Sequence, residues 1–366
     1  MPLIVDGITG VTFNDASLQG AAASPFGLKN RIINGDMVID QRNNGASVTP
    51  TATGYVSCDR WAPQLTQSSR FSVQQQTSVV PAGFTYAQRF TQLSSPTVSS
   101  GDYFGTEQTI EGFNIADLGF GSANAQTVTL SFWVRSSVTG TFCGSLWSAP
   151  ATRSYVFNYT ISSANTWEKK SITISGDTSG SYNTTNGAGL TVRFTFTAGS
   201  AFQTTAGSWV GANVAVTSGH TNFLATSGAT FFITGVQLER NTTATPFEWI
   251  PYSTELALCQ RYFYVIASGS GYFSNAAAQT TTNAFGMYTL PVTMRTAPTG
   301  SVVTGTNFYR FLANDTDDFV DSVYVNGQSP NNVIIGNSTQ ISNTQGRPGV
   351  FTAQNAASFV AAQAEL

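Results

Sequence analysis

The feature that most constrains how this chain folds is the repeated alternation of apolar and polar residues over short segments. In residues 128–135, Val128, Leu130, Phe132 and Val134 occupy every second position, and Thr, Ser, Trp and Arg fill the others. Successive side chains of a strand point to opposite faces, so this period predicts a strand with one face in a core. The same pattern recurs in residues 84–90, 154–161, 171–175 and 191–197. Many short strands of this kind predict an all-β sandwich or barrel.

The composition supports a β-rich protein and argues against several classes of function. Charged residues make up only 10% of the 366 residues, and the chain has 26 Phe, 13 Tyr and 6 Trp. Aromatic residues favour pleated surfaces and fill the cores of sandwiches. A formal net charge of −3 argues against nucleic acid as a partner, because phosphate binding requires clustered Lys and Arg. The sequence contains no run of about 18 apolar residues, so it does not predict a helix that spans a membrane.

The cysteines indicate a reducing compartment. Cys58, Cys143 and Cys259 are too few and too widely spaced for a disulfide framework or a zinc site, so we expect buried, reduced thiols. The first residues lack the basic and apolar regions of a signal peptide, so we expect synthesis in a cytosol.

Trp61 and Trp167 follow turns that lead into strands, and we expect both in the core.

The chain divides into three predicted parts. Residues 1–27 contain a strand-like segment at 11–13 and a turn at 14–15, but too little apolar surface to fold alone. We expect them to form a short extended arm that docks onto copies of itself or onto a larger assembly. Residues 28–253 form the main β-domain, and residues 254–366 form a second, smaller β-sandwich domain that ends in a strand within 356–366. The only helical turns are expected within 253–262.

The end of the main domain is predicted to be a strand followed by a turn. Uniform alternation places Phe232, Thr234, Val236 and Leu238 on one face of this strand. The threonine-rich segment that follows would leave the sheet, and Pro246 would end strand pairing.

Five segments, in this order, resemble a known family. They are NRIINGDMVIDQRNNG (30–45), DRW (59–61), VTLSFWVRSSVTG (128–140), NTWEKKSITISGD (165–177) and ITGVQLERNTTATPFEWIPYSTELALCQRYF (233–263). Together they resemble the jelly-roll module of bacteriophage tail-fibre and appendage proteins, which is similar in outline to carbohydrate-binding modules. The segment GVTFNDASLQGAA in the arm is similar to short segments of phage fibres. The resemblance covers roughly residues 28–263 and implies a jelly-roll β-sandwich.

The resemblance also implies a place of action and a set of partners. A phage appendage protein is made in the bacterial host cytoplasm and works in the virion, as part of a tail fibre, tail tip or head fibre. The arm would bind other virion proteins, and the chain would form a homo-oligomer, with a homotrimer favoured by the resemblance to fibres. Low charge suits subunits packed side by side, because few ions lose water at the interfaces. A host cell-surface glycan would be the external partner.

Sugar binding uses the faces of accessible aromatic rings, flanked by polar groups. Trp133 and Arg135 lie opposite the apolar face of their predicted strand, so we expect them on an accessible sheet surface. Trp147, Trp209 and Tyr103 lie in segments that resemble turns, and they complete the set of candidate ligand-binding residues. Covering a sheet or a subunit interface is the more frequent role of such aromatic residues and is the alternative for each of them.

The reactive residues do not predict an enzyme. His220 is the only histidine, it lies in a turn, and no nucleophile-elbow motif accompanies it. Two carboxylate pairs, Glu107 with Glu111 and Glu239 with Glu248, are the nearest candidates for glycoside hydrolysis, but neither belongs to a catalytic motif. We therefore predict no catalytic residues and no cofactor.

One structural metal site is implied by the resemblance. Jelly-roll carbohydrate modules often hold a Ca²⁺ ion near the opening strand, and Asp36 lies in the matching stretch. Val38 and Ile39 stand where such modules usually place a further acidic residue. A turn cap or strand-start cap is therefore the favoured role of Asp36, with calcium as the alternative.

These observations lead to the hypothesis of a non-enzymatic virion appendage protein that attaches to the host surface through glycan recognition. Two alternatives stay open. One is a capsid or baseplate decoration protein that binds no ligand, and the other is a polysaccharide-degrading tailspike whose carboxylates meet between subunits. Alternating strands do not separate the three, because a fold does not dictate a function.

Overall fold

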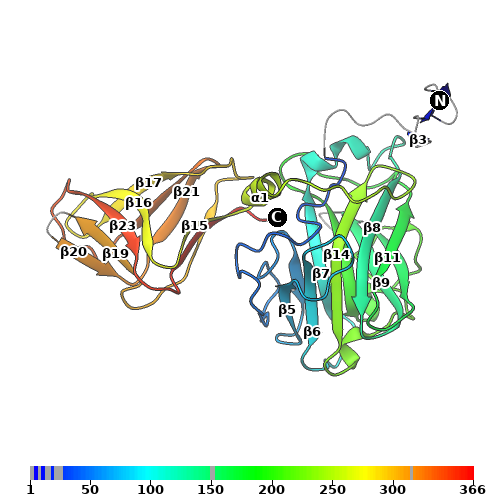
Figure 1. Cartoon of the computed structure of the whole chain (residues 1–366). Helices are drawn as coiled ribbons and strands as arrows, with labels where there is room; N and C mark the ends of the chain where they lie inside the picture. The colour runs from blue at the N-terminus through cyan, green and yellow to red at the C-terminus, as the bar shows by residue number, and fades with distance from the viewer. Residues whose placement is uncertain (1–3, 7–9, 13–17, 20–27, 149–152, 314–315) are drawn as a thin grey trace.

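The computed structural model describes residues 4–6, 10–12, 18–19, 28–148, 153–313 and 316–366. Strands make up 42% of the structure and helices 6%, and all pairs of named strands are antiparallel. A sandwich of two sheets lies at one end of the molecule, helix α1 (Tyr252–Gln260) follows it, and a further sheet extends beyond the helix (Figure 1). The all-β prediction is confirmed.

The sandwich comprises residues 62–239. Its six-stranded sheet contains, in spatial order, β13 (Trp209–Val210), β10 (Ser154–Ile161), β9 (Gly140–Ser148), β12 (Ala188–Ala198), β7 (Tyr103–Glu111) and β4 (Ala62–Leu65). Its five-stranded sheet contains β11 (Glu168–Ile174), β8 (Val128–Ser136), β14 (Thr230–Glu239), β6 (Ala87–Gln92) and β5 (Phe71–Gln76). The connections include the short 3₁₀ helices η1 (Gly112–Asn114), η2 (Ala116–Leu118), η3 (Ser200–Phe202) and η4 (Phe223–Ala225).

The core of the sandwich is built from the inward faces of the alternating strands. The four apolar side chains of β8 that alternate in the sequence are all fully buried, as predicted. Phe132 meets Phe194 of the opposite sheet edge-to-face, with 4.9 Å between ring centres. Trp61 is fully buried, as expected, and its indole N–H donates to the Asn34 carbonyl oxygen at 3.0 Å. Each buried aromatic side chain of this kind contributes roughly 1.5–3 kcal/mol by leaving water.

Strand β14 departs from the uniform alternation that the sequence predicted. Phe232 and Thr234 lie opposite the outward-facing residues of β8, whereas Val236 and Leu238 point into the core. The register shifts just after Thr234, where Gly235 adopts a φ of 60°. This is a β-bulge, in which an additional residue exchanges the two faces of a strand. The prediction that these four side chains share one face is therefore wrong.

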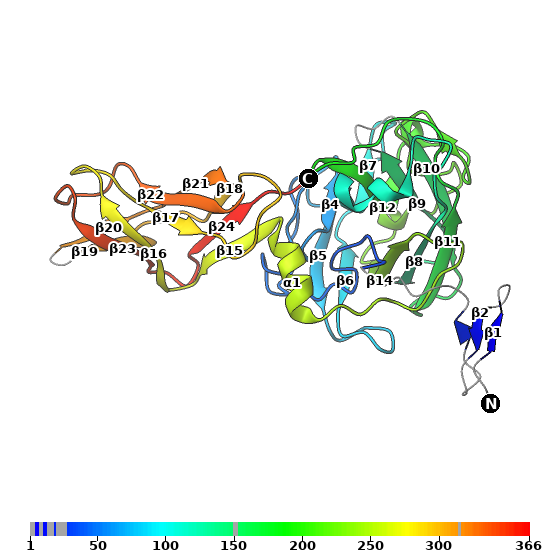
Figure 2. The ribbon, with the colours of Figure 1, turned by 90° about the horizontal axis from the view of Figure 1, so that it is seen from above.

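The C-terminal sheet is a single antiparallel sheet of ten strands. Its spatial order is β15 (Phe263–Ser268), β24 (Phe359–Gln363), β18 (Thr299–Val302), β21 (Tyr324–Ser329), β22 (Asn332–Asn337), β17 (Ala284–Thr289), β16 (Gly271–Ala278), β23 (Pro348–Ala353), β19 (Tyr309–Ala313) and β20 (Thr316–Val320). Large twisted sheets tend to curl, and this one forms a separate body of strands beyond α1 (Figure 2). Its inward side chains form an apolar core of their own. The final strand is present as predicted, and α1 occupies the segment where helical turns were expected.

Ion pairs join the C-terminal sheet to the sandwich. The carboxylate of Glu365 accepts hydrogen bonds from Arg42 and Arg60, and Arg60 is fully buried. At the end of β7, Glu111 binds Arg261, which directly follows α1, with 2.5 Å between the nearest nitrogen and oxygen. These contacts bring residues from opposite ends of the sequence together beside α1.

The arm and the cysteines can be compared with their predictions. The described parts of the arm, β1 (Ile4–Asp6), β2 (Gly10–Thr12) and β3 (Leu18–Gln19), pair with one another as a three-stranded antiparallel sheet. Phe13, Asn14 and Asp15 lie outside the described residues. All three cysteines are buried and unbridged, as predicted.

Candidate functional site

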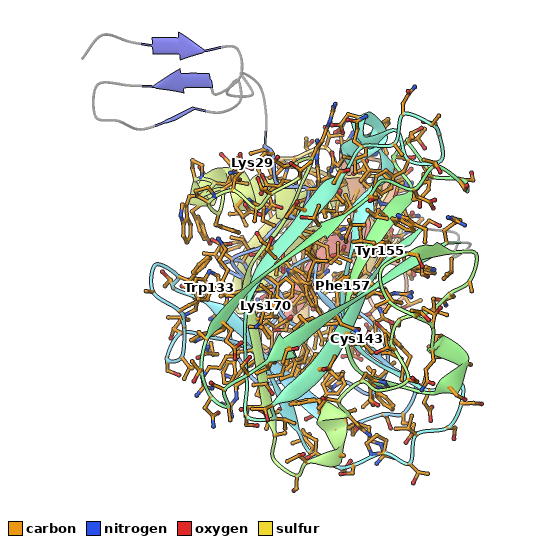
Figure 3. The ribbon with its side chains drawn as sticks, turned by 90° about the vertical axis from the view of Figure 1, so that its right-hand side faces the viewer. Lys29, Trp133, Cys143, Tyr155, Phe157 and Lys170 are labelled. Atoms are coloured by element: carbon orange, nitrogen blue, oxygen red, sulfur yellow. The ribbon has the colours of Figure 1, made fainter. Side chains whose placement is uncertain are left out.

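The outward face of the five-stranded sheet carries two of the predicted ligand-binding residues. Trp133 and Arg135 both project outward from β8, two residues apart. Trp133 is half-buried at the margin of the sandwich, away from Phe157 of the core (Figure 3). The alternation of β8 explains this position, because its other face is fully occupied by the core.

Trp133 belongs to a group of four aromatic side chains, which we call the aromatic surface. The other members are Phe84, Phe247 and Trp249, whose ring centres lie 4.9–5.3 Å from one another. A Cβ atom placed on Gly235 would lie 2.6 Å from the Phe84 ring and 3.0 Å from the Trp133 ring. The glycine of the bulge therefore lies against both rings, and Trp133 is a neighbour of Phe84. Trp249 has 56% of its surface exposed.

The segment that carries Phe247 and Trp249 is held against the sheet by hydrogen bonds to β14. The backbone N–H of Thr245 donates to the Glu239 carboxylate at 2.8 Å. The backbone N–H of Glu248 donates to the side-chain oxygen of Gln237, also at 2.8 Å. The chain therefore turns back over the outward face after β14, and this return supplies two of the four rings.

A row of large side chains crosses the same face next to the aromatic surface, and we call it the arginine row. Arg135 of β8 lies opposite Phe232 of β14, which lies opposite Arg89 of β6. The guanidinium carbons of the two arginines lie 4.9 and 5.8 Å from the centre of the Phe232 ring. Trp167 lies beside the same ring, with 6.1 Å between ring centres. Trp167 was expected in the core, and it instead lies half-buried on the outward face because it immediately precedes edge strand β11.

The structure places Trp147 and Tyr103 within strands, on the outward face of the six-stranded sheet. Trp147 lies on β9, so the prediction of a turn-like segment is wrong there. One face of its ring is covered by Arg193, whose guanidinium carbon lies 3.7 Å from the ring centre and whose Nε donates to Glu107. Tyr103 begins β7 and is 9% exposed, and burial raises its pKa to about 12. Both residues cover the sheet.

Trp209 also has a packing role. It lies on the two-residue edge strand β13, and its indole N–H donates to the Ser175 carbonyl oxygen at 2.8 Å. Its ring packs against Tyr155 and Phe120, with ring centres 5.5 and 5.8 Å away. Trp133 and Arg135 therefore lie together on one outward face, and Trp147 and Tyr103 lie beside Arg193 on the opposite face. Trp209 packs against the core at a sheet edge.

Asp36 lies in a turn beside other acidic residues. Burial raises the pKa of Asp36, and hydrogen bonds from its own backbone N–H and that of Val38 oppose this effect. Burial, followed by the charges of Asp36 and Glu248, also raises the pKa of Glu255, to about 7. Within the described ranges, no group of three or more His, Cys, Asp or Glu side chains is arranged to hold a metal ion.

The four carboxylates considered for hydrolysis each have bonding partners in the fold. Their partners are Arg193 for Glu107, Arg261 and Tyr262 for Glu111, Thr245 and Gln237 for Glu239, and the Asn30 backbone N–H for Glu248. Burial raises the pKa of Glu107 against the opposing charge of Arg193. The His220 ring lies in a turn, with Nδ1 2.9 Å from the Thr217 carbonyl oxygen. These contacts are the ordinary ones of strand ends and turns.

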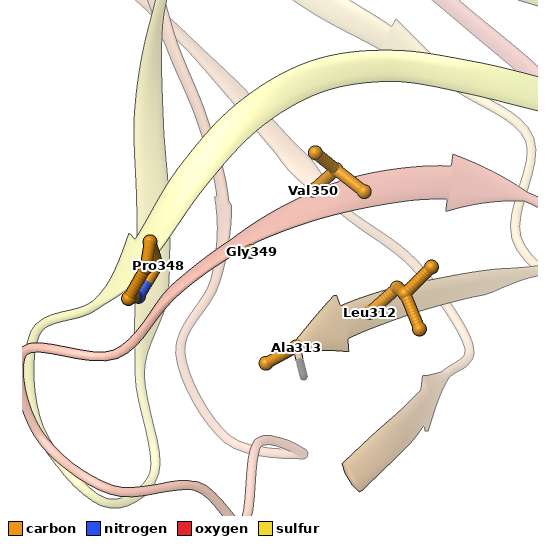
Figure 4. Close-up of a pocket in the computed structure, with 5 residues that line it drawn as sticks. All are labelled: Leu312, Ala313, Pro348, Gly349 and Val350. Atoms are coloured by element: carbon orange, nitrogen blue, oxygen red, sulfur yellow. The ribbon is translucent and has the colours of Figure 1, made fainter. Parts of the chain in front are cut away.

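Two further cavities lie outside the aromatic surface. One, of about 490 Å³, is lined by Leu312, Ala313, Pro348, Gly349 and Val350 of β19 and β23 (Figure 4). The described residues that line it offer apolar side chains and backbone groups. The other, of about 420 Å³, lies at the junction between the sandwich and the C-terminal sheet, beside Tyr55, Arg295 and Glu365.

No helix among the described residues is long and apolar enough to cross a bilayer.

Sequence reasoning missed most of the aromatic surface. Phe84, Phe247 and Trp249 were not among the candidate residues, and neither was Arg89 of the arginine row. The density of aromatic residues in PFEW, directly after a turn, was an available signal. What the sequence did not reveal was that this segment folds back over the sheet that carries Trp133.

No family model and no curated protein matches this chain. Among solved structures, the enzymatically active domain of tailspike protein 4 of bacteriophage CBA120 is similar over 58% of this chain and 21% of that chain, with 12% identity and a TM-score of 0.30. The family 11 carbohydrate-binding module of Clostridium thermocellum is similar over 49% of this chain and 88% of that one, with 10% identity and a TM-score of 0.26. The CBM22-1–GH10 modules of endo-1,4-β-D-xylanase 10B of the same organism are similar over 54% and 28%, with 12% identity and a TM-score of 0.28.

Proposed function

We propose that this protein is a non-enzymatic structural subunit of a bacteriophage appendage, and that it attaches to the host surface by binding glycans at the aromatic surface. The observation that carries the proposal is the group formed by Phe84, Trp133, Phe247 and Trp249, with Trp249 56% exposed. Contiguous exposed apolar groups mark binding or interaction surfaces, whereas single exposed apolar residues do not. Aromatic rings flanked by polar groups bind the apolar faces of sugar rings.

The polar surroundings of the rings suit a sugar ligand. Lys169 is exposed and lies opposite Trp133 on the neighbouring strand β11. Its ammonium group can donate hydrogen bonds to sugar hydroxyls at the edge of a stacking platform. The proposed role includes no catalytic step, in keeping with the structural partners of the four candidate carboxylates.

Binding to host cells tests the proposal. Labelled full-length protein is mixed with cells before and after periodate oxidation of their surface sugars. We expect oxidation to abolish binding, and Trp249→Ala and Trp133→Ala to weaken it about tenfold, the order of magnitude for the loss of an aromatic stacking partner. Tyr272→Ala is the matched control, because Tyr272 is an aromatic residue of the C-terminal sheet with 72% exposure.

Three results would contradict the proposal. Equal binding to oxidised and untreated cells would exclude a glycan receptor. Unchanged binding by both tryptophan variants would exclude the aromatic surface as the site, and a complete lack of binding would favour a decoration protein.

The proposal also includes self-assembly, with a homotrimer favoured by the resemblance to fibres and the arm as the contact to other virion proteins. The low content of charged residues supports close packing of subunits, because few ions would lose their water. Sedimentation of the full chain measures the oligomeric state directly, and a stable monomer would contradict this part of the proposal.

A further inference from the structure

The arginine row has a regular geometry that follows from the pairing of three strands. Arg89, Phe232 and Arg135 occupy directly opposite positions on β6, β14 and β8. Adjacent strands lie about 4.8 Å apart, so the two arginine backbones are about 10 Å from each other on either side of one phenylalanine. Phe232 is 4% exposed, and both guanidinium groups lie against its ring. The row is therefore a rigid base with one positive charge at each side.

The two charges of this row are not compensated by acidic side chains. Neither Arg89 nor Arg135 forms an ion pair with a carboxylate anywhere in the described part of the chain. Burial and the charge of Arg89 both lower the pKa of Arg135, so the two guanidinium groups repel each other. Two like charges placed side by side destabilise the free protein unless a ligand or solvent compensates them.

The row also presents hydrogen-bond donors that have no acceptor within the fold. Arg135 uses only its Nε, which donates to the Asn165 carbonyl oxygen at 2.9 Å, so its terminal nitrogens have no protein acceptor among the described residues. The Nε of Arg89 and the indole Nε1 of Trp167 are shielded from solvent and have no acceptor among the described residues. A buried donor without an acceptor costs about 1–3 kcal/mol. The terminal nitrogens of Arg89 and Arg135 also have no acceptor among the described residues, and they are not shielded, so they are the donors that an acceptor from outside can reach.

We propose that the arginine row binds an oxyanion group carried by the glycan, such as the carboxylate of a uronic acid or a sulfate ester, so that the ligand of this protein is an acidic polysaccharide. This inference rests on the proposed glycan-binding function and adds the charge of the ligand to it. The sugar ring would stack on the aromatic surface, and its oxyanion would lie between Arg89 and Arg135. Planar guanidinium groups suit this role, because they bind oxyanions through paired N–H donors.

Two matched pairs of polymers test the inference and separate the two sources of negative charge. Polygalacturonate is compared with its carboxyl-reduced form, and dextran sulfate is compared with dextran, by affinity electrophoresis of the full-length protein at low and high salt. We expect the acidic member of at least one pair to bind more tightly than its neutral counterpart, and salt to weaken that binding. Arg89→Gln and Arg135→Gln should each weaken it about tenfold or more, as expected for the loss of charge-assisted hydrogen bonds.

Arg240→Gln is the matched control for net charge. Arg240 is exposed, its terminal nitrogen donates to the Gln126 side chain at 3.0 Å, and it forms no ion pair among the described residues. This variant should bind like the unaltered protein. The midpoint of urea unfolding is measured for all three variants, so that a folding defect is not mistaken for a binding defect.

Each outcome has a defined meaning. Equal binding of the acidic and neutral polymers, no binding of either acidic polymer, or equal affinities of Arg89→Gln, Arg135→Gln and Arg240→Gln would each overturn the inference. The proposed function would survive the first and third of these results if Trp249→Ala still weakened binding. Conversely, loss of acidic-polymer binding in the two arginine variants with no effect of Trp249→Ala would support the arginine row and contradict the aromatic surface.

Discussion

Replacing Glu365 by Gln should destabilise the junction between the sandwich and the C-terminal sheet. One carboxylate oxygen of Glu365 accepts from Arg42 at 2.7 Å, and the other accepts from Arg60. Arg60 is fully buried, and its guanidinium carbon lies 3.6 Å from the centre of the Tyr262 ring. The amide of glutamine would remove the negative charge and direct an N–H group at one of the two arginines.

The size of the loss in unfolding free energy depends on which contacts Arg60 keeps in the variant. Removing one partner of a buried ion pair costs about 3–5 kcal/mol, because the remaining charge stays buried. We expect a loss of about 3 kcal/mol, near the lower end of that range. The reasons are that the Glu365 side chain is 12% exposed and that Arg60 keeps its hydrogen bond to the Thr109 carbonyl oxygen at 2.6 Å.

Urea unfolding with two signals measures this loss. All six tryptophans lie between residues 61 and 249, so their fluorescence reports on the sandwich and its surroundings. Far-UV circular dichroism reports on both β-structures. In the Glu365→Gln variant we expect a lower midpoint and a separation of the two transitions, because the C-terminal sheet would lose its main charged contact with the sandwich.

Asp117→Asn is the matched control for removing a carboxylate from an ion pair. Asp117 binds Arg31 at 2.6 Å, but its side chain is 44% exposed, so the change should cost less than about 1 kcal/mol. If Glu365→Gln costs no more than Asp117→Asn and the two transitions remain coincident, the argument that Glu365 holds the junction is refuted.

Two further predictions concern the pH dependence of stability and the bulge in β14. Because burial raises the folded-state pKa of Glu255 from 4.5 to about 7, its contribution to stability is fully present below 4.5 and is lost as the pH rises through about 7. Glu255→Gln should flatten this dependence in urea unfolding, and an unchanged pH profile would contradict it. Gly235→Ala should cost about 1–3 kcal/mol, because the new Cβ would combine a φ of 60° with a 2.6 Å contact to Phe84. Gly228→Ala, with a φ of 68° and no atom within 4 Å of the new Cβ, is the control and should cost less in the same measurement.

The class of fold could be predicted from the sequence because it depends on local periodicity. The alternation in β8 placed Val128, Leu130, Phe132 and Val134 in the core without any knowledge of their partners. The bulge at Gly235 could not be predicted in this way. A single additional residue changes the face of every later side chain in β14, and only the pairing with β8 reveals it.

The candidate site was predicted only in part, because it is assembled from segments distant in the sequence. Trp133 and Arg135 were identified because both lie on one alternating strand. Trp249 joins them only when the chain returns over the sheet, and Arg89 comes from a strand about 46 positions earlier than Arg135, through the adjacency of strands in a sandwich. Trp147 resembled a loop residue because its neighbours are Gly, Ser and Pro, yet strand β9 extends through it.

The scarcity of charge in this chain makes the pairing of each arginine informative. Charged residues are only 10% of the sequence, and the arginines with buried side chains have carboxylate partners, as Arg60 has Glu365 and Arg193 has Glu107. Arg89 and Arg135 are half-buried and, like Arg70, Arg240 and Arg295, have no carboxylate partner among the described residues. What distinguishes Arg89 and Arg135 is that both guanidinium groups lie against one ring, that of Phe232. An anion supplied from outside, at the face that also carries the exposed aromatic rings, would compensate these two neighbouring charges.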